Sequence, residues 1–313
     1  MGGHVLRALL SAGYRVRALV RPGSQLPALD GCTQVVGDLV RPGDLVPSME
    51  DCRYLVHVAA LYSFNPGDRA RIWTTNLAGT KGLLEAARIA RVERAVVTSS
   101  SATVGPVRGG RLPTEQDWAS DPNGSDAYHH SKLAQERASL AARVPVSVIL
   151  PTAPVGPGDW KPTPTGKMIV DFMRGRIFAT LEGGLNIVPV EDVAHAHILA
   201  LQRGQERERY LIGGQNLTLS QLWQRLAAIT HRVPPSRRLP YSLAVGMARL
   251  DAVRCRLQPE ARPVVPLEGV RLGRETMWIN GSKAERELGY RSGSVDEALA
   301  RAVAWFRDNG YAA

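Results

Sequence analysis

Two side chains four residues apart, Tyr128 and Lys132, carry the strongest chemical signal in this sequence. They lead into the helix-forming run Leu133-Ala134-Gln135-Glu136-Arg137-Ala138, so they should share one face of a helix. A neighbouring ammonium group favours the phenolate form of tyrosine, whose ordinary pKa is about 10. The pair could therefore exchange a proton with a substrate near neutral pH.

A cluster of hydroxyl groups precedes this pair. The apolar run Ala95-Val96-Val97 predicts a buried parallel strand, and Thr98-Ser99-Ser100-Ser101-Ala102-Thr103 follows it directly. Ligands of open α/β sheets bind at the carboxyl ends of the strands, so a serine emerging there can point its hydroxyl at a substrate. These hydroxyl groups make the chemical interpretation of Tyr128 and Lys132 the favoured one.

The alternative is structural. With eight tyrosines and five lysines in 313 residues, a Tyr-x-x-x-Lys spacing should arise by chance roughly 0.1 times. Tyr128 would then be a core residue of an amphipathic helix, Lys132 would face solvent, and the serines would cap a helix. We favour the catalytic interpretation because the strand, the serines and the pair occur together.

The strand end 98–103 followed by Tyr128-x-x-x-Lys132 resembles the extended short-chain dehydrogenase/reductases. That family includes nucleotide-sugar epimerases and dehydratases and the dihydroflavonol reductases. The resemblance implies a catalytic serine at Ser100, with Ser101 the second choice, and a catalytic Tyr128 and Lys132 over a nicotinamide ring. Two further stretches, 162–172 and 210–218, resemble the hopanoid-associated sugar epimerases, and the likeness covers nearly the whole chain.

The end of a strand predicted at 15–20 bears on the choice of cofactor. Dinucleotide folds that select NAD carry an acidic residue near this point, whereas an arginine accommodates the 2′-phosphate of NADP. Arg21 occupies this position and no acidic residue stands beside it, which favours NADP(H) and leaves NAD(H) as the alternative. The resemblance implies further cofactor contacts at Gly2, Asp38, Leu39, Ala59, Ala60, Tyr128, Lys132 and Pro151.

Cationic residues follow the strand at 146–150 and its proline-rich end. Lys161, Lys167 and Arg174 lie in the segment from Asp159 to Gly175. Together with Ser101 they are our candidates for substrate contacts, since cations beside a hydride-transfer site could hold a phosphate or a carboxylate. A solvated loop explains them almost as well.

Composition excludes several classes of protein. The net charge is +10, yet acidic and basic residues are interleaved without a basic block, which argues against nucleic-acid binding. Three distant cysteines suit reduced thiols and imply neither a disulfide framework nor a metal site. No long apolar span or signal peptide is apparent, so we expect a cytoplasmic enzyme with a small-molecule substrate, and a homodimer is an open alternative.

The fold class that follows is α/β, a Rossmann-like doubly wound parallel sheet with a smaller C-terminal α/β lobe. We expect a dinucleotide-binding domain over 1–155 and a mainly substrate-binding lobe over 156–313, with some segments returning to the first domain. The family begins with a strand and Gly-x-x-Gly-x-x-Gly, of which only Gly2 can be matched here. We therefore expect the sheet to lack its first strand, the natural protein to start upstream, and this chain to bind cofactor poorly.

The function expected from this site is NAD(P)-dependent hydride transfer assisted by Ser100, Tyr128 and Lys132. Three interpretations stay open. The first is an epimerase or dehydratase acting on a nucleotide-sugar-like substrate, with a role in hopanoid metabolism. The second is an NADPH-dependent carbonyl reductase of the dihydroflavonol type, and the third is a non-catalytic nucleotide-binding protein on the same fold.

Overall fold

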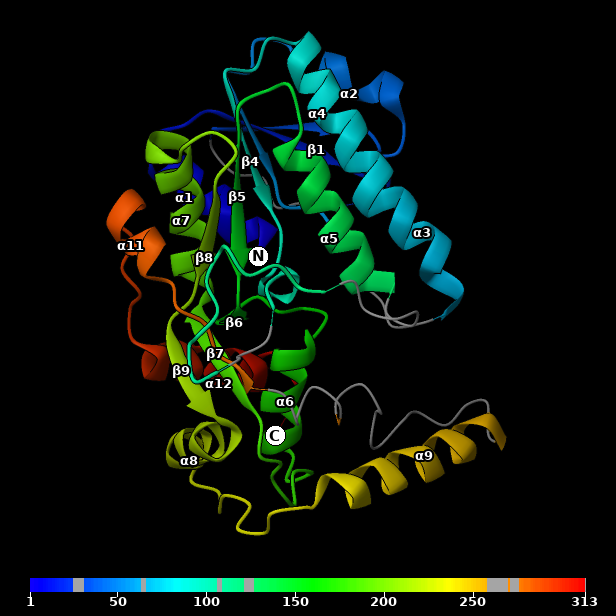
Figure 1. The fold of residues 1–313 in the computed structure, drawn as a ribbon, viewed down its shortest axis with the longest axis vertical. Coiled ribbons are helices and arrows are strands. Elements are labelled where there is room, and N and C mark those ends of the chain that lie inside the picture. The colour runs from blue at the N-terminus through cyan, green and yellow to red at the C-terminus, as the bar shows by residue number, and fades with distance from the viewer. Residues whose placement is uncertain are drawn as a thin grey trace.

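The computed structural model describes residues 1–24, 31–62, 66–105, 109–120, 127–257, 270 and 276–312. Within them, helices flank two larger sheets that are stacked along the long axis of the molecule (Figure 1). The upper part in that view carries the first sheet, and the lower part carries the second. The predicted α/β class and Rossmann-like architecture are confirmed.

The first sheet has four parallel strands in the order β3-β4-β5-β8. These strands are β3 (Tyr54–His57), β4 (Arg94–Thr98), β5 (Val146–Pro151) and β8 (Arg209–Ile212). The last two residues of β4 pair with Val148 and Ile149 of β5, so both strands end at the same edge. The two central strands are almost wholly buried, as a parallel sheet covered on both faces requires.

Helices cover the two faces of this sheet. On one face lie α1 (Gly2–Ser11), α7 (Val190–Arg203) and α11 (Ser282–Leu288), and on the other lie α2 (Pro42–Ser48), α4 (Gly79–Ile89) and α5 (Ala127–Leu140) (Figure 1). A short helix α3 (Arg69–Trp73) runs into a π-helical turn at Thr74–Ala78 before α4 begins. Each face has its own apolar cluster, so the sheet is the centre of the core.

Two strands stand apart from this sheet. β1 (Val16–Val20) and β2 (Cys32–Val36) pair with each other in parallel and form a separate two-stranded sheet. Residues 16–20 and 54–58 both line one large cavity, and in the described part of the chain no strand joins β1 to β3. The expected lack of a strand between them is therefore confirmed, and the facing backbone edges of β1 and β3 have no ladder partner among the described strands.

The second sheet has the order β10-β7-β6, with β9 antiparallel to β7. Its strands are β6 (Ala153–Val155), β7 (Gly184–Pro189), β9 (Gln215–Thr218) and β10 (Thr276–Met277). It packs with α6 (Pro164–Met173), α8 (Leu219–Thr230) and α12 (Val295–Asp308) around a third apolar cluster. Because β8 and α7 return to the first sheet, the chain crosses between the two parts more than once.

The longest of the described helices, α9 (Tyr241–Leu257), extends away from the lower part in Figure 1. None of the helices in the described ranges is long and apolar enough to span a membrane. Asp192 lies in the first turn of α7 and links this helix to the C-terminal part of the chain. Its carboxylate accepts hydrogen bonds from the Gly293 N–H and the Ser292 hydroxyl, so it ties the C-terminal segment to the helix.

Candidate active site

Ser100 stands where β4 ends and a short 3-10 turn, Ser101–Thr103, begins. Its backbone is extended, and its hydroxyl oxygen accepts a hydrogen bond from the Ala102 N–H at 3.2 Å. Because that oxygen is the acceptor, its own proton remains to be donated. Ser100 and Ser101 both line the large cavity, so a donor hydroxyl lies at the strand edge as the sequence predicts.

Tyr128 and Lys132 are placed by α5, whose first two turns carry them on one face. The Tyr128 ring is half-buried, lines the cavity and packs edge-on against the Tyr62 ring with centroids 4.5 Å apart. Lys132 is 2% exposed, so its charge is held inside the protein next to the cavity. This burial lowers the pKa of the Lys132 ammonium to about 8.

A chain of buried polar groups holds the lysine. Lys132 Nζ donates to the carbonyl oxygen of Thr98 at 2.8 Å and to Gln135 Oε1 at 2.6 Å. The Gln135 amide nitrogen then donates to the Thr80 hydroxyl at 2.8 Å, and that hydroxyl lies 2.8 Å from His57 Nε2. Burial lowers the pKa of His57 to about 3, so the imidazole is neutral and can accept from Thr80. His57 is thus a hydrogen-bonded core residue.

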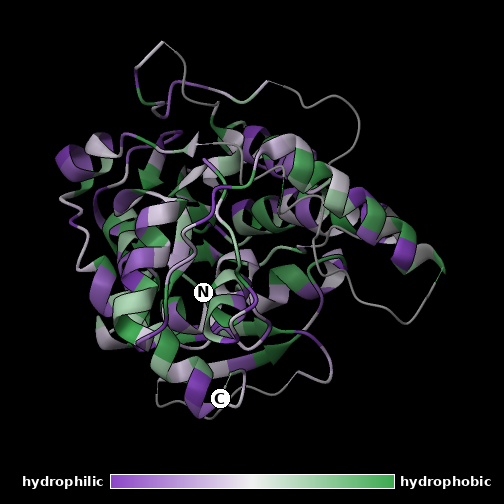
Figure 2. Ribbon diagram, turned by 90° about the horizontal axis from the view of Figure 1, so that it is seen from below, coloured by the Kyte–Doolittle hydropathy of each residue, from purple (hydrophilic) through white to green (hydrophobic). Residues whose placement is uncertain are grey.

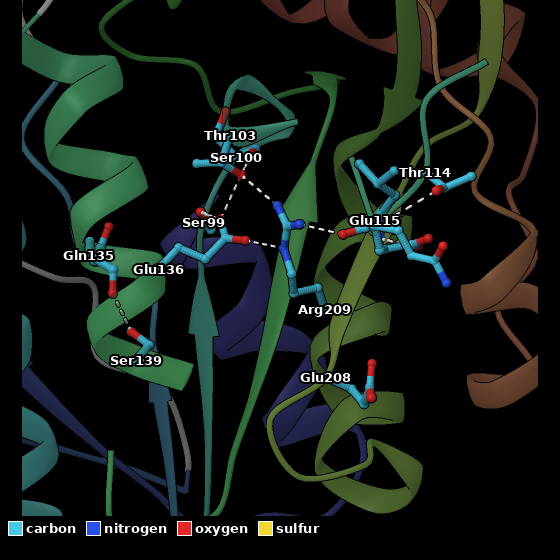
Figure 3. Close-up of polar contacts among 12 residues, drawn as sticks. Ser99, Ser100, Thr103, Thr114, Glu115, Gln135, Glu136, Ser139, Glu208 and Arg209 are labelled. Carbon is cyan, nitrogen blue, oxygen red and sulfur yellow. Dashed lines mark hydrogen bonds and ion pairs between the residues drawn. The ribbon is translucent and has the colours of Figure 1, made fainter. Parts of the chain in front are cut away.

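A second buried network lies one turn farther along α5, around Glu136 (Figure 3). Glu136, fully buried, accepts hydrogen bonds from the hydroxyls of Ser99 and Thr103, which flank the Ser100 turn. Its carboxylate also forms an ion pair with Arg209 of β8, a residue that is 5% exposed. The catalytic helix and the serine turn are therefore joined through one carboxylate.

Arg209 extends this network away from the cavity. Its guanidinium donates to the backbone oxygen of Glu115 and to the Thr103 hydroxyl, and it stacks 3.6 Å from the centre of the Trp118 ring (Figure 3). The Glu115 carboxylate accepts from the Leu211 N–H, and burial raises the pKa of Glu115. A buried charge needs partners that replace the water it has lost, and here the hydrogen bonds and the Trp118 ring supply them for the Arg209 guanidinium.

Asn76, in the π-helical turn, is a third buried polar residue near the site. Its side chain accepts from the N–H of Leu61 and donates to the carbonyl oxygen of Leu61 and to the Ser131 hydroxyl. It thus fixes the backbone beyond β3 against α5.

One continuous cavity of about 2770 Å³ connects these groups to the edge of the first sheet. The proposed cofactor residues that line it are Gly2, Arg21, Asp38, Leu39, Ala59, Ala60, Tyr128, Lys132 and Pro151. Arg21 is exposed just after β1, and Asp38 accepts from the Val40 N–H in a turn just after β2. The α1 amino terminus opens onto the same space, and a Cβ at Gly2 would meet nothing within 4 Å.

These residues fit a nicotinamide dinucleotide. A dinucleotide in this cavity would meet the Arg21 cation at one end, the amino terminus of α1 in the middle, and Tyr128 with Lys132 at the other end. The small side chains of Ala59 and Ala60 after β3 leave room for a ligand close to the backbone.

Beyond the catalytic groups, the cavity continues into an apolar chamber formed by α6, the segment 176–181, α8 and α9. Its apolar lining residues are Met168, Ile177, Phe178, Leu181, Trp223, Leu239, Ala244, Met247 and Val270. Among the proposed substrate residues, Lys161 and Lys167 lie on the cavity lining, and Lys167 forms an ion pair with Asp171. Arg174 is exposed at the end of α6 and lies outside the lining, whereas Arg176 lies on it.

Sequence reasoning did not identify Tyr62, Gln135, Glu136 or Arg209 as parts of the site. The helix face alone could have indicated Glu136, which follows Lys132 by four residues. Arg209 and Tyr62 gave no such signal, because they come from β8 and the loop after β3 and reach α5 only in the folded protein.

Comparison with known proteins agrees with this geometry. Residues 1–213 match the model of the NAD dependent epimerase/dehydratase family. A protein of Synechocystis sp. provisionally named dihydroflavonol 4-reductase is 38% identical over 99% of this chain and 93% of its own length. Sterol demethylase protein B of Methylococcus capsulatus is 35% identical over 99% of this chain and 96% of its own length.

A solved structure gives the same picture. The nucleoside-diphosphate-sugar epimerase PA4631 from Pseudomonas aeruginosa is 26% identical, with a TM-score of 0.80 over 100% of this chain and 95% of that one. The family binds NAD(H) or NADP(H), and its members are epimerases, dehydratases and reductases. This chain is therefore an enzyme of the NAD dependent epimerase/dehydratase family, within the extended short-chain dehydrogenase/reductases.

Proposed function

We propose that this enzyme interconverts a secondary alcohol and a ketone on a largely apolar ring system. The observation that carries the proposal is the group of apolar side chains that line the same cavity as Tyr128, because such a lining suits a bulky hydrophobic substrate. The names of the two relatives above, a dihydroflavonol reductase and a sterol demethylase protein, support the same substrate class.

In the proposed reaction three side chains act on the reacting oxygen. Tyr128 gives a proton to the ketone oxygen during reduction and takes it from the alcohol during oxidation. Ser100 donates a hydrogen bond to the same oxygen, which stabilises negative charge that develops there. Lys132, fixed by Thr98 and Gln135, favours the tyrosine phenolate and would bind the nicotinamide ribose. The bound nicotinamide would supply or accept the hydride.

NADP(H) is the proposed cofactor, because Arg21 is the cation at the end of β1 that lines the cavity. Arg21→Ala should weaken binding of NADPH by about tenfold and leave NADH affinity nearly unchanged, since only NADPH has a 2′-phosphate to lose. Binding is measured by cofactor fluorescence, with Arg15→Ala at the start of the same region as the control. Equal losses for both cofactors would place the phosphate site elsewhere.

A second candidate is epimerisation of a nucleotide sugar, in which the cofactor stays bound and returns hydride to the opposite face. Lys161 and Arg176 on the cavity lining favour it, because they could hold a diphosphate, and the Pseudomonas epimerase has the same fold. A role in hopanoid metabolism would be compatible with either substrate class, and we keep it as part of the proposal.

The two candidates predict opposite cofactor behaviour. With NADPH and either a dihydroflavonol or a 3-ketosteroid, the purified chain should consume NADPH in proportion to alcohol formed. Phe178→Gln in the chamber should raise KM for such ketones by about tenfold, because an apolar contact is lost, and leave kcat nearly unchanged. Interconversion of UDP-glucose and its 4-epimer without net cofactor consumption would overturn the proposed substrate class and support the second candidate.

A further inference from the structure

The helix α9 has two apolar faces. On its inner face, Ala244 and Ala248 are buried and pack with Val270 in a small apolar cluster. Ala244 and Met247 also line the chamber of the active site, so this face forms part of the chamber wall. The helix itself extends away from the body of the protein (Figure 1).

The outer face carries large apolar side chains in contact with solvent. The exposed fractions are 54% for Leu243, 73% for Leu250, 50% for Val253 and 78% for Leu257. Three of these residues are seven apart, and the fourth follows Leu250 by three, so all four lie on one stripe of the helix. Figure 2 shows hydrophobic and hydrophilic residues interleaved along this helix.

This exposure is concentrated in one segment. Thirteen large hydrophobic residues are exposed in the described chain, and five of them lie within 233–257: the four above and Val233, which is 90% exposed. The other eight are spread over several elements. Exposed apolar residues that gather on one stripe often mark an interaction surface, whereas single exposed apolar residues are common on any protein surface.

The same segment is strongly basic. Residues 232–257 contain six arginines and one acidic residue, Asp251, which pairs with Arg254. Arg232, Arg237, Arg238 and Arg249 are exposed. The surface therefore combines protruding apolar side chains with an excess of positive charge, the two features that bind a peripheral helix to an anionic lipid surface.

We propose that α9, with the arginine-rich segment 232–238 that precedes it, docks on the surface of an anionic lipid bilayer. Leu243, Leu250, Val253 and Leu257 enter the interface between headgroups and acyl chains, and the arginines bind lipid phosphates. A second copy of this chain fits less well, because it would bring two sets of arginines together without acidic partners. Docking requires no spanning helix.

This placement would put one helix between the bilayer and the active-site chamber. An apolar substrate could then pass from the lipid phase to the chamber wall at Met247 without crossing water. This consequence rests on the proposed substrate class, whereas the docking itself depends only on the surface of α9. An experiment without substrate or cofactor therefore tests the docking separately.

The test is co-sedimentation of the 313-residue chain with vesicles of phosphatidylcholine mixed with phosphatidylglycerol, compared with vesicles of phosphatidylcholine alone. The expected result is binding to the mixed vesicles that weakens at high salt. Serine substitution of Leu243, Leu250, Val253 and Leu257 together should weaken binding at least about tenfold, because each buried apolar side chain adds to the transfer free energy. Circular dichroism checks that the variant is folded.

Two further variants separate the contributions. Arg237→Gln with Arg238→Gln should weaken binding to the anionic vesicles by about 30-fold, since each basic residue near the surface contributes roughly 1 kcal/mol of attraction, and about 1.4 kcal/mol corresponds to tenfold in affinity. Ile89→Ser, which removes an exposed apolar side chain from α4, is the matched control and should bind as the parent does.

Equal binding of the α9 variants and the parent would overturn the proposal, as would no binding of the parent to mixed vesicles. A concentration-dependent dimer that the α9 substitutions abolish, without vesicle binding, would also overturn it and identify a second copy as the occupant. Failure of the ketone assay with intact vesicle binding would count against the substrate class alone.

Discussion

Lys132 Nζ lies 2.6 Å from Gln135 Oε1, so the amide oxygen of Gln135 accepts a hydrogen bond from the buried lysine while its amide nitrogen donates one to the Thr80 hydroxyl. The direction of each hydrogen bond is fixed, because a lysine can only donate and the neutral His57 beyond Thr80 accepts at Nε2. Gln135 is therefore a positioning residue for the catalytic lysine. Glu136, Tyr128 and His57 are the other titratable groups close to Lys132 on the elements packed around it.

The first prediction concerns this contact. Gln135→Glu places a carboxylate beside the ammonium, which should raise the pKa of Lys132 and move the basic limb of the pH–rate profile to higher pH. Gln135→Leu leaves the ammonium with fewer acceptors and should move that limb to lower pH while reducing kcat by about tenfold. Ser139→Ala, which removes a buried hydroxyl bonded to the Gln135 backbone, is the control. Profiles that do not move in either Gln135 variant would contradict the positioning role.

Tyr128→Phe removes the transferable proton and keeps the ring that packs against Tyr62. Turnover should fall by about 10²–10⁴-fold, and cofactor affinity should stay nearly unchanged. Lys132→Ala should weaken cofactor binding as well. Steady-state kinetics and cofactor titration measure the two effects, with Tyr311→Phe, at a tyrosine that does not line the cavity, as the matched control. A Tyr128→Phe enzyme that keeps most of its activity would exclude Tyr128 as the acid and base.

The buried pair of Glu136 and Arg209 should matter for stability. Glu136→Gln leaves the guanidinium without its counter-charge in the interior and should lower the free energy of unfolding by about 3–5 kcal/mol. Glu93→Gln breaks the exposed pair with Arg53 and should cost far less, because solvent screens both charges. Urea unfolding followed by fluorescence compares them, and similar small losses in both variants would show that the buried pair contributes little.

Stability should fall on acidification because two buried histidines remain neutral in the folded state. Burial lowers the pKa of His197 to about 4 and that of His57 to about 3, whereas in the unfolded chain each takes up a proton near pH 6.5. Between about pH 6.5 and pH 4 the unfolded state therefore binds more protons, and stability decreases as the pH falls. Each histidine contributes at most about 1.4 kcal/mol per pH unit.

The measurement is the free energy of unfolding across this pH range. In His197→Gln the number of protons taken up on unfolding should fall by about one, so the free energy of unfolding should depend less steeply on pH. The substitution also removes the hydrogen bonds to Thr98 and to the Val193 carbonyl. His195→Gln changes an exposed residue on the same helix and should keep the parent slope. An unchanged slope in the His197 variant would show that this imidazole does not stay neutral on folding.

The sequence alone was sufficient for the elements that carry the chemistry. Local patterns predicted the apolar strand before Ser100, the helix that bears Tyr128 and Lys132, and Arg21 at the end of the preceding strand. They sufficed because strand burial, helical spacing and turn residues depend on neighbours in the chain. The α/β class follows from the same patterns, whereas the lack of a strand between β1 and β3 was expected from the family resemblance.

The tertiary structure decided which distant groups complete the site. The Glu136–Arg209 pair joins positions 73 residues apart, Tyr62 in the loop after β3 contacts Tyr128 of α5, and the apolar chamber is assembled from segments that are far apart in the chain. The exposure of one apolar stripe on α9 likewise depends on which face packs against the body. Residue type and spacing cannot specify these contacts, because they arise only when the sheets and helices pack and determine which charges lose water and which apolar faces keep it.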